Sequence, residues 1–495
     1  MEVIKLQDVY KDTGVPTYTF VQPKEYVKTK VAVGTQGKGL IVEGPSGIGK
    51  TTSIKKIISE LGMDVTQLSA RKEEDIELID ILLQDNKNLG IVLIDDFHML
   101  TINRREAIAN LLKTIADENR EDIKLILIGI NKAGDALVKL APDLNNRIDT
   151  ITFESNPPEK IKELIEKGEK ALNIVFGNKD EIVQRAQGSF HITQLLCKEL
   201  CIMQEIVETQ REHTVVSASV SQACEIKTRE LARVYESVVR SFSIGNKTRR
   251  GGRAPYFHLL MWLSESKDWA IHMDSIYVKY PIFKQSISQV AEKGYLSDLI
   301  VKNENHSKYL HYDNDAKILT VEDPKFMFYL RNLDWDATAK EIGFTNIHFK
   351  HKYDFALSFA GEIRDFPQRL SEILINDYDY NVFYDMNERA EILGRNLEEY
   401  FAPIYSSDAE YVIVFMDDHY ANKIWTVFES KAYKERFAHD KVIPIISQSF
   451  VISPTDILFN KGYQRFDYKK DIESQMQELA SLLDEKIKLN RLAQK

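Results

Sequence analysis

The sequence has few cysteines and no excess of positive charge. Three cysteines in 495 residues cannot build a disulfide framework. Cys197 and Cys201 lie one helical turn apart, without a histidine pair spaced near them for zinc, so we interpret them as buried thiols in a reducing, cytoplasmic compartment. Lysine and arginine total 65 against 75 acidic residues, a formal charge of −10. This balance argues against a chain that coats nucleic acid through its overall charge.

Long apolar runs and repeats are also missing. No stretch of eighteen apolar residues is present, so we expect no membrane-spanning helix and no membrane partner. The first dozen residues are polar and lack the apolar core of a secretory signal. The absence of any repeat of 20 to 50 residues excludes a solenoid or propeller. With 43% hydrophobic and 28% charged residues, the composition is that of a globular protein, and its length suggests three or four domains.

Short apolar runs alternate with helical segments from about Leu40 to Phe153. This rhythm is typical of an α/β fold with a buried parallel sheet, whose strands read as continuous apolar stretches. The runs comprise residues 40–42, 91–94 and 125–128.

Gly44–Thr51 matches the complete P-loop pattern, after the first apolar run and at the start of a predicted helix. Backbone N–H groups of such a turn point toward phosphates, Lys50 supplies a positive charge, and the Thr51 hydroxyl is a ligand for Mg²⁺. We therefore predict ATP or ADP with Mg²⁺ as cofactors. The predicted nucleotide-binding residues are Gly44, Pro45, Ser46, Gly47, Ile48, Gly49, Lys50, Thr51 and Thr52.

Two aspartates end the second apolar run. We assign Asp95 to the metal, together with Thr51, and Asp96 to a base that orients the attacking water. Asn131 follows the third run and is a candidate contact for the γ-phosphate or the water. Arg147 precedes the next strand, and two interpretations stay open for it: a phosphate contact in its own or a neighbouring subunit, or a surface salt bridge.

This first region resembles the STAND branch of P-loop ATPases, relatives of AAA+ proteins. The resemblance is carried by Gly14–Val21, by Gly39–Glu43 before the loop, and by the double aspartate. It implies that a helical lid and a winged helix follow the ATPase core, and that nucleotide state controls oligomerisation. The expected ranges are 1–155 for the P-loop NTPase domain, 156–238 for the helical lid and 239–340 for the winged-helix-like domain.

A basic segment, Lys247–Arg253, lies at the start of the winged-helix range. Because a winged helix can bind DNA, nucleic-acid contact stays open, but the segment has no interleaved aromatic residues. We favour a solvated linker.

A second α/β rhythm begins at Tyr353. Its apolar runs predict a flavodoxin-like parallel sheet, with a ligand crevice beyond the ends of the strands. A final helix is expected to place Ile472, Met476, Leu479 and Leu483 on one face. The predicted strands comprise residues 353–361, 381–385, 411–415 and 442–446.

This region, 348–495, resembles a bacterial-type TIR domain. The matching blocks comprise residues 358–362, 383–385, 393–395, 402–405 and 425–429. Many TIR domains cleave NAD⁺ at the nicotinamide–ribose bond, and the resemblance makes Glu429 the catalytic residue and NAD⁺ the substrate. A carboxylate beside the ribose can stabilise the oxocarbenium character that develops as this bond breaks.

Further roles follow from that resemblance. Trp425 lies one helical turn before Glu429, so both side chains face the same side and the ring can stack on the substrate. Ser358 and Phe359, at the end of the first strand, would line the nicotinamide side. The loop around Gly394 and Arg395 would gate entry.

A nucleotide switch joined to a TIR effector resembles prokaryotic antiviral proteins. We expect a homo-oligomer that forms through the ATPase and TIR domains after a phage-derived trigger and then depletes NAD⁺. Two alternatives stay open: a TIR adaptor without catalysis, and an ATPase regulator that binds DNA through the basic segment.

Overall fold

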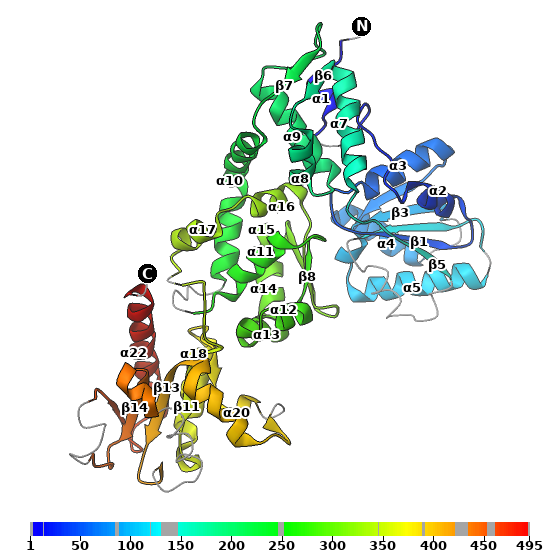
Figure 1. The fold of residues 1–495 in the computed structure, drawn as a ribbon. Helices are drawn as coiled ribbons and strands as arrows, with labels where there is room; N and C mark the ends of the chain where they lie inside the picture. Colours follow the sequence, from blue (N-terminus) through cyan, green and yellow to red (C-terminus); the bar gives the residue numbers. More distant parts are fainter. Residues whose placement is uncertain are drawn as a thin grey trace. The chain divides into compact units, whose positions relative to one another are not determined.

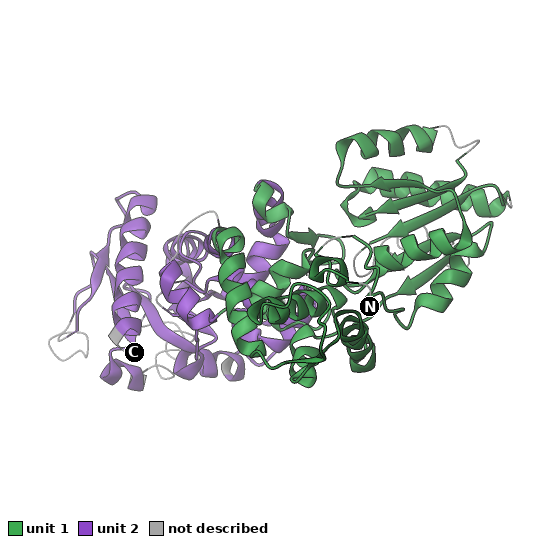
Figure 2. Ribbon diagram, turned by 90° about the horizontal axis from the view of Figure 1, so that it is seen from above, with its two compact units in different colours: residues 1–238, 262–271, 303–333 green, residues 239–261, 272–302, 334–495 purple. Residues whose placement is uncertain are grey.

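The computed structural model (Figure 1) describes residues 3–12, 14–84, 89–118, 120–129, 147–245, 252–344, 346–388, 392–420, 434–452 and 461–493. The chain divides into two compact units, coloured separately in Figure 2. Unit 1 comprises Met1–Val238, Trp262–Ile271 and Asn303–Leu333, and unit 2 comprises Val239–Met261, His272–Lys302 and Asp334–Lys495. Each unit contains a five-stranded parallel sheet. The four domain ranges expected from the sequence remain predictions.

The sheet of unit 1 has the strand order β2-β3-β4-β1-β5, and its neighbouring strands pair in parallel. The α/β pattern predicted for this region is therefore confirmed. Its strands are β1 (Gly39–Glu43), β2 (Thr66–Ser69), β3 (Ile91–Asp95), β4 (Lys124–Ile128) and β5 (Ile148–Thr152). The strand β2 has no signal in the sequence, because its residues are half-exposed and polar rather than a buried apolar run.

Helices cover both faces of this sheet. Leu40 and Val42 of β1 point to the face that α2 (Tyr26–Gly34) and α3 (Lys50–Leu61) cover. Ile41 points to the opposite face, under α4 (Glu73–Gln84) and α5 (Ile102–Asp117). Because side chains alternate in this way, the sheet is buried on both sides. The P-loop, which joins β1 to α3, lies at the carboxyl edge of this sheet.

The rest of unit 1 is mainly helical and includes a small sheet of three strands in the order β8-β10-β9. The strands β9 and β10 pair in an antiparallel hairpin. The strands are β6 (Ile174–Phe176), β7 (Thr214–Val216), β8 (Ala270–His272), β9 (Leu310–Asp313) and β10 (Ile318–Val321). The helices are α1 (Leu6–Val9), α7 (Pro158–Leu172), α8 (Lys179–Ala186), α9 (Phe190–Met203), α10 (Val220–Ile244, which runs on into unit 2), α15 (Glu304–Ser307) and α16 (Pro324–Arg331).

The sheet of unit 2 has the parallel order β12-β11-β13-β14-β15. Numbered along the chain, this is the order 2-1-3-4-5 of flavodoxin-like sheets, as predicted. Its strands are β11 (Tyr353–Ser358), β12 (Val382–Phe383), β13 (Ala409–Met416), β14 (Val442–Ser447) and β15 (Gln464–Phe466).

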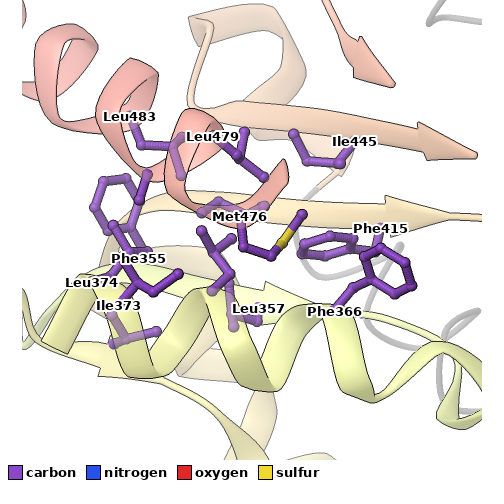
Figure 3. Close-up of a cluster of buried hydrophobic side chains, with 14 of the residues drawn as sticks. Phe355, Leu357, Phe366, Ile373, Leu374, Phe415, Ile445, Met476, Leu479 and Leu483 are labelled. Atoms are coloured by element: carbon purple, nitrogen blue, oxygen red, sulfur yellow. The ribbon is translucent and has the colours of Figure 1, made fainter. Parts of the chain in front are cut away.

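Two helices, α18 (Asp365–Asn376) and α22 (Ile472–Ala493), pack on one face of this sheet. Figure 3 shows Met476, Leu479 and Leu483 of α22 directed at strand residues such as Phe355 and Ile445, so the predicted apolar face of the last helix is confirmed. The opposite face is covered by α20 (Leu397–Pro403), the π-helix Ile404–Asp408 and the 3₁₀ helix Lys434–His439.

The remaining helices of unit 2 precede the sheet in sequence. They are α11 (Pro255–Glu265, whose last turn belongs to unit 1), α12 (Met273–Lys279), the 3₁₀ helix Pro281–Phe283, α13 (Lys284–Glu292), α14 (Tyr295–Val301) and α17 (Trp335–Ile342). Among the helices that the structure describes, none is long and apolar enough to cross a membrane.

Arg253 corrects one expectation. Its side chain is completely buried, and its Nε donates to Asp354 Oδ2 at 2.9 Å. Its Nη2 donates to the carbonyl oxygen of His351 at 2.9 Å, and its guanidinium lies 4.3 Å from the ring centre of Phe349. The expectation of a solvated linker is therefore wrong for this residue, because a buried aspartate pairs with it. Residues 246–251 lie outside the described residues.

Candidate functional site

The P-loop is a tight turn between β1 and α3. Gly44 and Gly49 have φ values of +140° and +103°, which side-chain-bearing residues rarely adopt. A Cβ atom on Gly44 would lie 2.2 Å from the backbone oxygen of Phe153, so a side chain has no room there. The turn presents the N-terminus of α3, where free backbone N–H groups favour a phosphate.

The side chain of Lys50 folds back over this turn. Its Nζ donates to the carbonyl oxygens of Gly44 and Pro45, both at 2.6 Å. Burial lowers the pKa of Lys50 to about 8, although the nearby charges of Asp95 and Asp96 act to raise it. The ammonium group is thus held by neutral carbonyl oxygens, which phosphate oxygens can replace as stronger, charged partners.

Thr51 and Asp95 meet beside the P-loop. The Thr51 hydroxyl donates to Asp95 Oδ2 at 3.1 Å. Burial, and then the charge of Asp96, raise the pKa of Asp95. Asp96 itself has a left-handed backbone with φ 56° and donates its N–H to Asp95 Oδ1 at 3.0 Å. Hydroxyl and carboxylate oxygens are the ligands that Mg²⁺ prefers, so Thr51 and Asp95 fit the predicted metal.

These groups line one pocket of about 250 Å³ in unit 1. Thr52 also lines it, as predicted, and α9 contributes Phe190, His191 and Gln194 to its wall. The side chain of Ile48 is instead buried in the core, so only its backbone is available to a ligand. The pocket combines a cation, a hydroxyl, two carboxylates and an aromatic ring, as the recognition of a nucleoside polyphosphate requires.

A second set of charges in this pocket was missed by sequence reasoning. Arg71, just after β2, donates from Nε to Asp96 Oδ2 at 2.8 Å and also pairs with Glu322, which follows β10. Glu322 Oε1 lies 2.6 Å from His98 Nε2. Burial opposes ionisation of Glu322, but the hydrogen bond and charge of His98, with the charge of Arg71, lower its pKa to about 2. Asp96 is therefore engaged by an arginine in this structure.

Arg147, one of the predicted nucleotide contacts, lies away from the P-loop. Arg147 immediately precedes β5, at the amino edge of the sheet, and its Nη1 lies 2.8 Å from Asp117 Oδ1. Because β5 runs parallel to β1, this position is at the sheet edge opposite the P-loop. Arg147 thus makes a salt bridge in this structure, and its contact with phosphate, in its own or a neighbouring subunit, remains a prediction. Asn131 lies outside the described residues.

The candidate NAD⁺ residues of unit 2 are described in part. Ser358 is completely buried, and its hydroxyl lies 2.6 Å from that of Tyr420, so it does not line an open surface here. Phe359 is half-buried and stacks on Tyr384, with ring centres 5.7 Å apart and planes at 27°. The Arg364 guanidinium lies 5.1 Å from the centre of the Phe359 ring. An aromatic surface with a cation above it therefore lies at the carboxyl end of β11.

The predicted gating loop is exposed. Gly394 has φ +79°, and the Arg395 guanidinium lies 5.3 Å from the ring centre of Tyr400. Trp425 and Glu429 lie outside the described residues, so their roles remain predictions.

Comparisons with known proteins agree with the nucleotide site. The family model described as "ATPase family associated with various cellular activities (AAA)" matches residues 40–156. The 3′ cyclic ADP-D-ribose synthase AaTIR of Aquimarina amphilecti is 33% identical over 139 residues, which are 28% of this chain and 41% of that protein. The chain thus spans less than half the length of this curated relative.

Similarity to solved structures is low, both in TM-score and in sequence identity. The ORC1 protein of Aeropyrum pernix in complex with DNA has a TM-score of 0.36 at 15% identity and covers 68% of this chain and 97% of its own. The RuvB Holliday junction branch migration motor of Thermotoga maritima has a TM-score of 0.33 at 16% identity and covers 61% of this chain and 92% of its own. Scores this low support no argument about function.

The P-loop geometry, the parallel sheet around it and the family match lead to one conclusion. Residues 40–156 form an AAA ATPase domain, which implies a site for ATP or ADP, and 139 residues of the chain are similar to a TIR-named cyclic ADP-ribose synthase.

Proposed function

We propose that this chain is an ATP-regulated enzyme that cleaves NAD⁺ at the nicotinamide–ribose bond through a C-terminal TIR domain. The observation that carries the proposal is the similarity of 139 residues to a cyclic ADP-ribose synthase, in a chain that also holds an AAA nucleotide pocket. The parallel sheet of order 2-1-3-4-5 in unit 2 supports the assignment, because ligands bind beyond the carboxyl ends of such strands.

In the nucleotide pocket, the backbone of the P-loop and Lys50 hold the phosphates, and Thr51 and Asp95 hold Mg²⁺, which neutralises charge on the phosphates when bound. In this proposal Asp96 orients a water toward the γ-phosphate once Arg71 releases it. An aspartate reaches less far than a glutamate, so we expect slow turnover and a role as a switch.

In the TIR domain, Glu429 stabilises the positive charge that develops on the ribose, and Trp425 stacks on the substrate. Phe359 offers a flat aromatic surface at the end of β11, and the loop of Gly394 and Arg395 controls access. Cleavage ends in hydrolysis or in cyclisation of the ADP-ribose, and the name of the curated relative favours testing for the cyclic product.

The parts act together in an antiviral response. A helical lid at 156–238 and a winged helix at 239–340 connect the ATPase to the TIR domain at 348–495. A phage-derived trigger and ATP select the conformation that assembles into a cytoplasmic homo-oligomer, since a ligand favours the state it binds better.

The test is NAD⁺ loss by the purified chain, with and without ATP and Mg²⁺, with products identified by mass spectrometry. We expect Glu429→Ala to abolish the loss and Lys50→Ala to abolish its dependence on ATP. Glu435→Ala, at an exposed glutamate in the nearby 3₁₀ helix, is the matched control and should behave as wild type.

The same variants are then compared in cells challenged with phage, where the trigger is present. NAD⁺ that stays constant in challenged cells carrying the wild-type chain would contradict the proposal and favour an adaptor.

A further inference from the structure

The strand β12 is the edge of the unit 2 sheet, with β11 on one side of it. On its other side lies the side chain of Gln285, from α13. Gln285 Nε2 donates to the Val382 carbonyl oxygen at 2.9 Å, and the Val382 N–H donates to Gln285 Oε1 at 2.8 Å. A side-chain amide carries the same donor and acceptor as a peptide group. Gln285 therefore takes the place that a further strand would occupy.

Two more polar contacts tie this part of the sheet to the same segment. Gln289, one turn further along α13, donates from Nε2 to Asn376 Oδ1 at 2.9 Å, at the end of α18. Asn381, just before β12, donates from Nδ2 to the carbonyl oxygen of Ile282 at 2.6 Å. The helix is thus held against both the start of β12 and the helix that precedes it.

The contact between α13 and α18 is made by polar side chains and leaves a cavity. A cavity of about 620 Å³ lies between α13 and α18, and Gln285, Gln289, Ser371 and Asn381 line it. Ser371 Oγ and Asn381 Oδ1 are buried there without a hydrogen-bond partner among the described residues. Polar, loosely packed contacts are typical of surfaces that separate again, unlike the apolar, closely packed cores of permanent ones.

The covered edge has consequences for assembly. An open edge strand exposes unpaired N–H and C=O groups that pair with another chain.

We infer that α13 is an inhibitory clamp: through Gln285 it closes the β12 edge and keeps the C-terminal domains of separate chains from assembling. Its effect on catalysis rests on the proposed NAD⁺ function, whereas its effect on the strand and on assembly does not.

Gln285→Glu tests the clamp in the full chain, because it keeps the size of the side chain but sets a carboxylate against the Val382 carbonyl. Gln285→Met keeps the length and removes both hydrogen bonds, which guards against a folding defect of the first variant. Lys293→Ala is the matched control, since Lys293 is exposed, follows the same helix and lines the same cavity. The readouts are hydrogen exchange across residues 378–386, mass in solution and NAD⁺ loss without a trigger.

For Gln285→Met, which removes the acceptor of the Val382 N–H, we expect exchange of the Val382 amide to rise about tenfold, the scale of one lost hydrogen bond. Gln285→Glu keeps an acceptor for this N–H and loses the donor to the Val382 carbonyl. We also expect larger assemblies and a basal NAD⁺ loss several-fold above wild type, with Lys293→Ala unchanged. Unchanged exchange in Gln285→Met would overturn the clamp, and so would faster exchange without a change in mass or NAD⁺ loss. Faster exchange with larger assemblies that never consume NAD⁺ would support the clamp and refute the proposed catalysis instead.

Discussion

Asp354 is a single buried carboxylate on which two arginines from distant parts of the sequence converge. Arg253 lies before α11 and Arg491 near the end of α22, and both side chains are buried beside it. Arg491 Nη2 also lies 2.7 Å from Glu410 Oε2. Removing one partner from a buried ion pair leaves an uncompensated charge, which is costly. The network therefore fastens the segment before α11 to the sheet of unit 2.

We predict that Asp354→Asn destabilises unit 2 by about 3–5 kcal/mol, the usual cost of breaking a buried pair. Urea unfolding followed by circular dichroism measures the loss. Glu435→Ala, which removes an exposed carboxylate, serves as the control and should leave stability within about 0.5 kcal/mol of wild type.

The ionisation of Asp354 also makes the stability of unit 2 depend on pH. Burial acts to raise the pKa of Asp354, but the charges and hydrogen bonds of Arg253 and Arg491 outweigh it and lower the pKa. Its stabilisation is thus complete above the unfolded-state pKa of about 4 and is lost as the pH falls below that value toward the folded-state pKa. Stability of the wild type should fall in this range more steeply than that of Asp354→Asn. Parallel curves would contradict the assignment.

Among the elements, α22 shows how one helix separates a buried face from an exposed one. Leu483 is 2% exposed and packs in the core drawn in Figure 3, whereas the adjacent Leu482 is 46% exposed. The two leucines differ only in which side of the helix they occupy.

This pair gives a matched prediction. Leu483→Ala should lower the free energy of unfolding by about 2–5 kcal/mol, because it leaves a cavity in a packed core. Leu482→Ala should change it by less than about 0.5 kcal/mol. Equal effects of the two substitutions in urea unfolding would contradict the packing of α22.

Elements with a strong local signal could be predicted, and those defined by distant partners could not. The strands β1, β3 and β4 are continuous apolar runs, and the P-loop is a local motif. Arg71 lies beside Asp96 only because β2 pairs with β3, which no local pattern reveals. Glu322, 251 residues from Arg71 in the sequence, reaches the same pocket without any sequence signal. The composition around Arg253 indicated a solvated segment. Its partner, Asp354, lies 101 residues away in the sequence, so the local pattern could not show that Arg253 is buried.

In the whole molecule, the nucleotide pocket belongs to unit 1 and the Asp354 network to unit 2. Ligand binding stabilises the folded part that holds the site, by about 2.7 kcal/mol at a hundredfold excess over Kd. Units with separate cores can unfold in separate steps.

We therefore predict that Mg²⁺-ADP raises one thermal transition of the full chain in calorimetry and leaves a second unchanged. Asp354→Asn should lower the second transition alone, and Lys50→Ala should abolish the shift caused by ADP. A single transition that moves with both changes would show that the two units unfold together.

The division into units has a further consequence for proteolysis and truncation of this chain. Between residues 239 and 333 the polypeptide passes from one unit to the other repeatedly, with borders after Val238, Met261, Ile271, Lys302 and Leu333. One protease nick in this stretch leaves the halves joined by the other crossings. A truncation that begins or ends there removes pieces of both units at once. Dissection of this protein therefore calls for point substitutions rather than fragments.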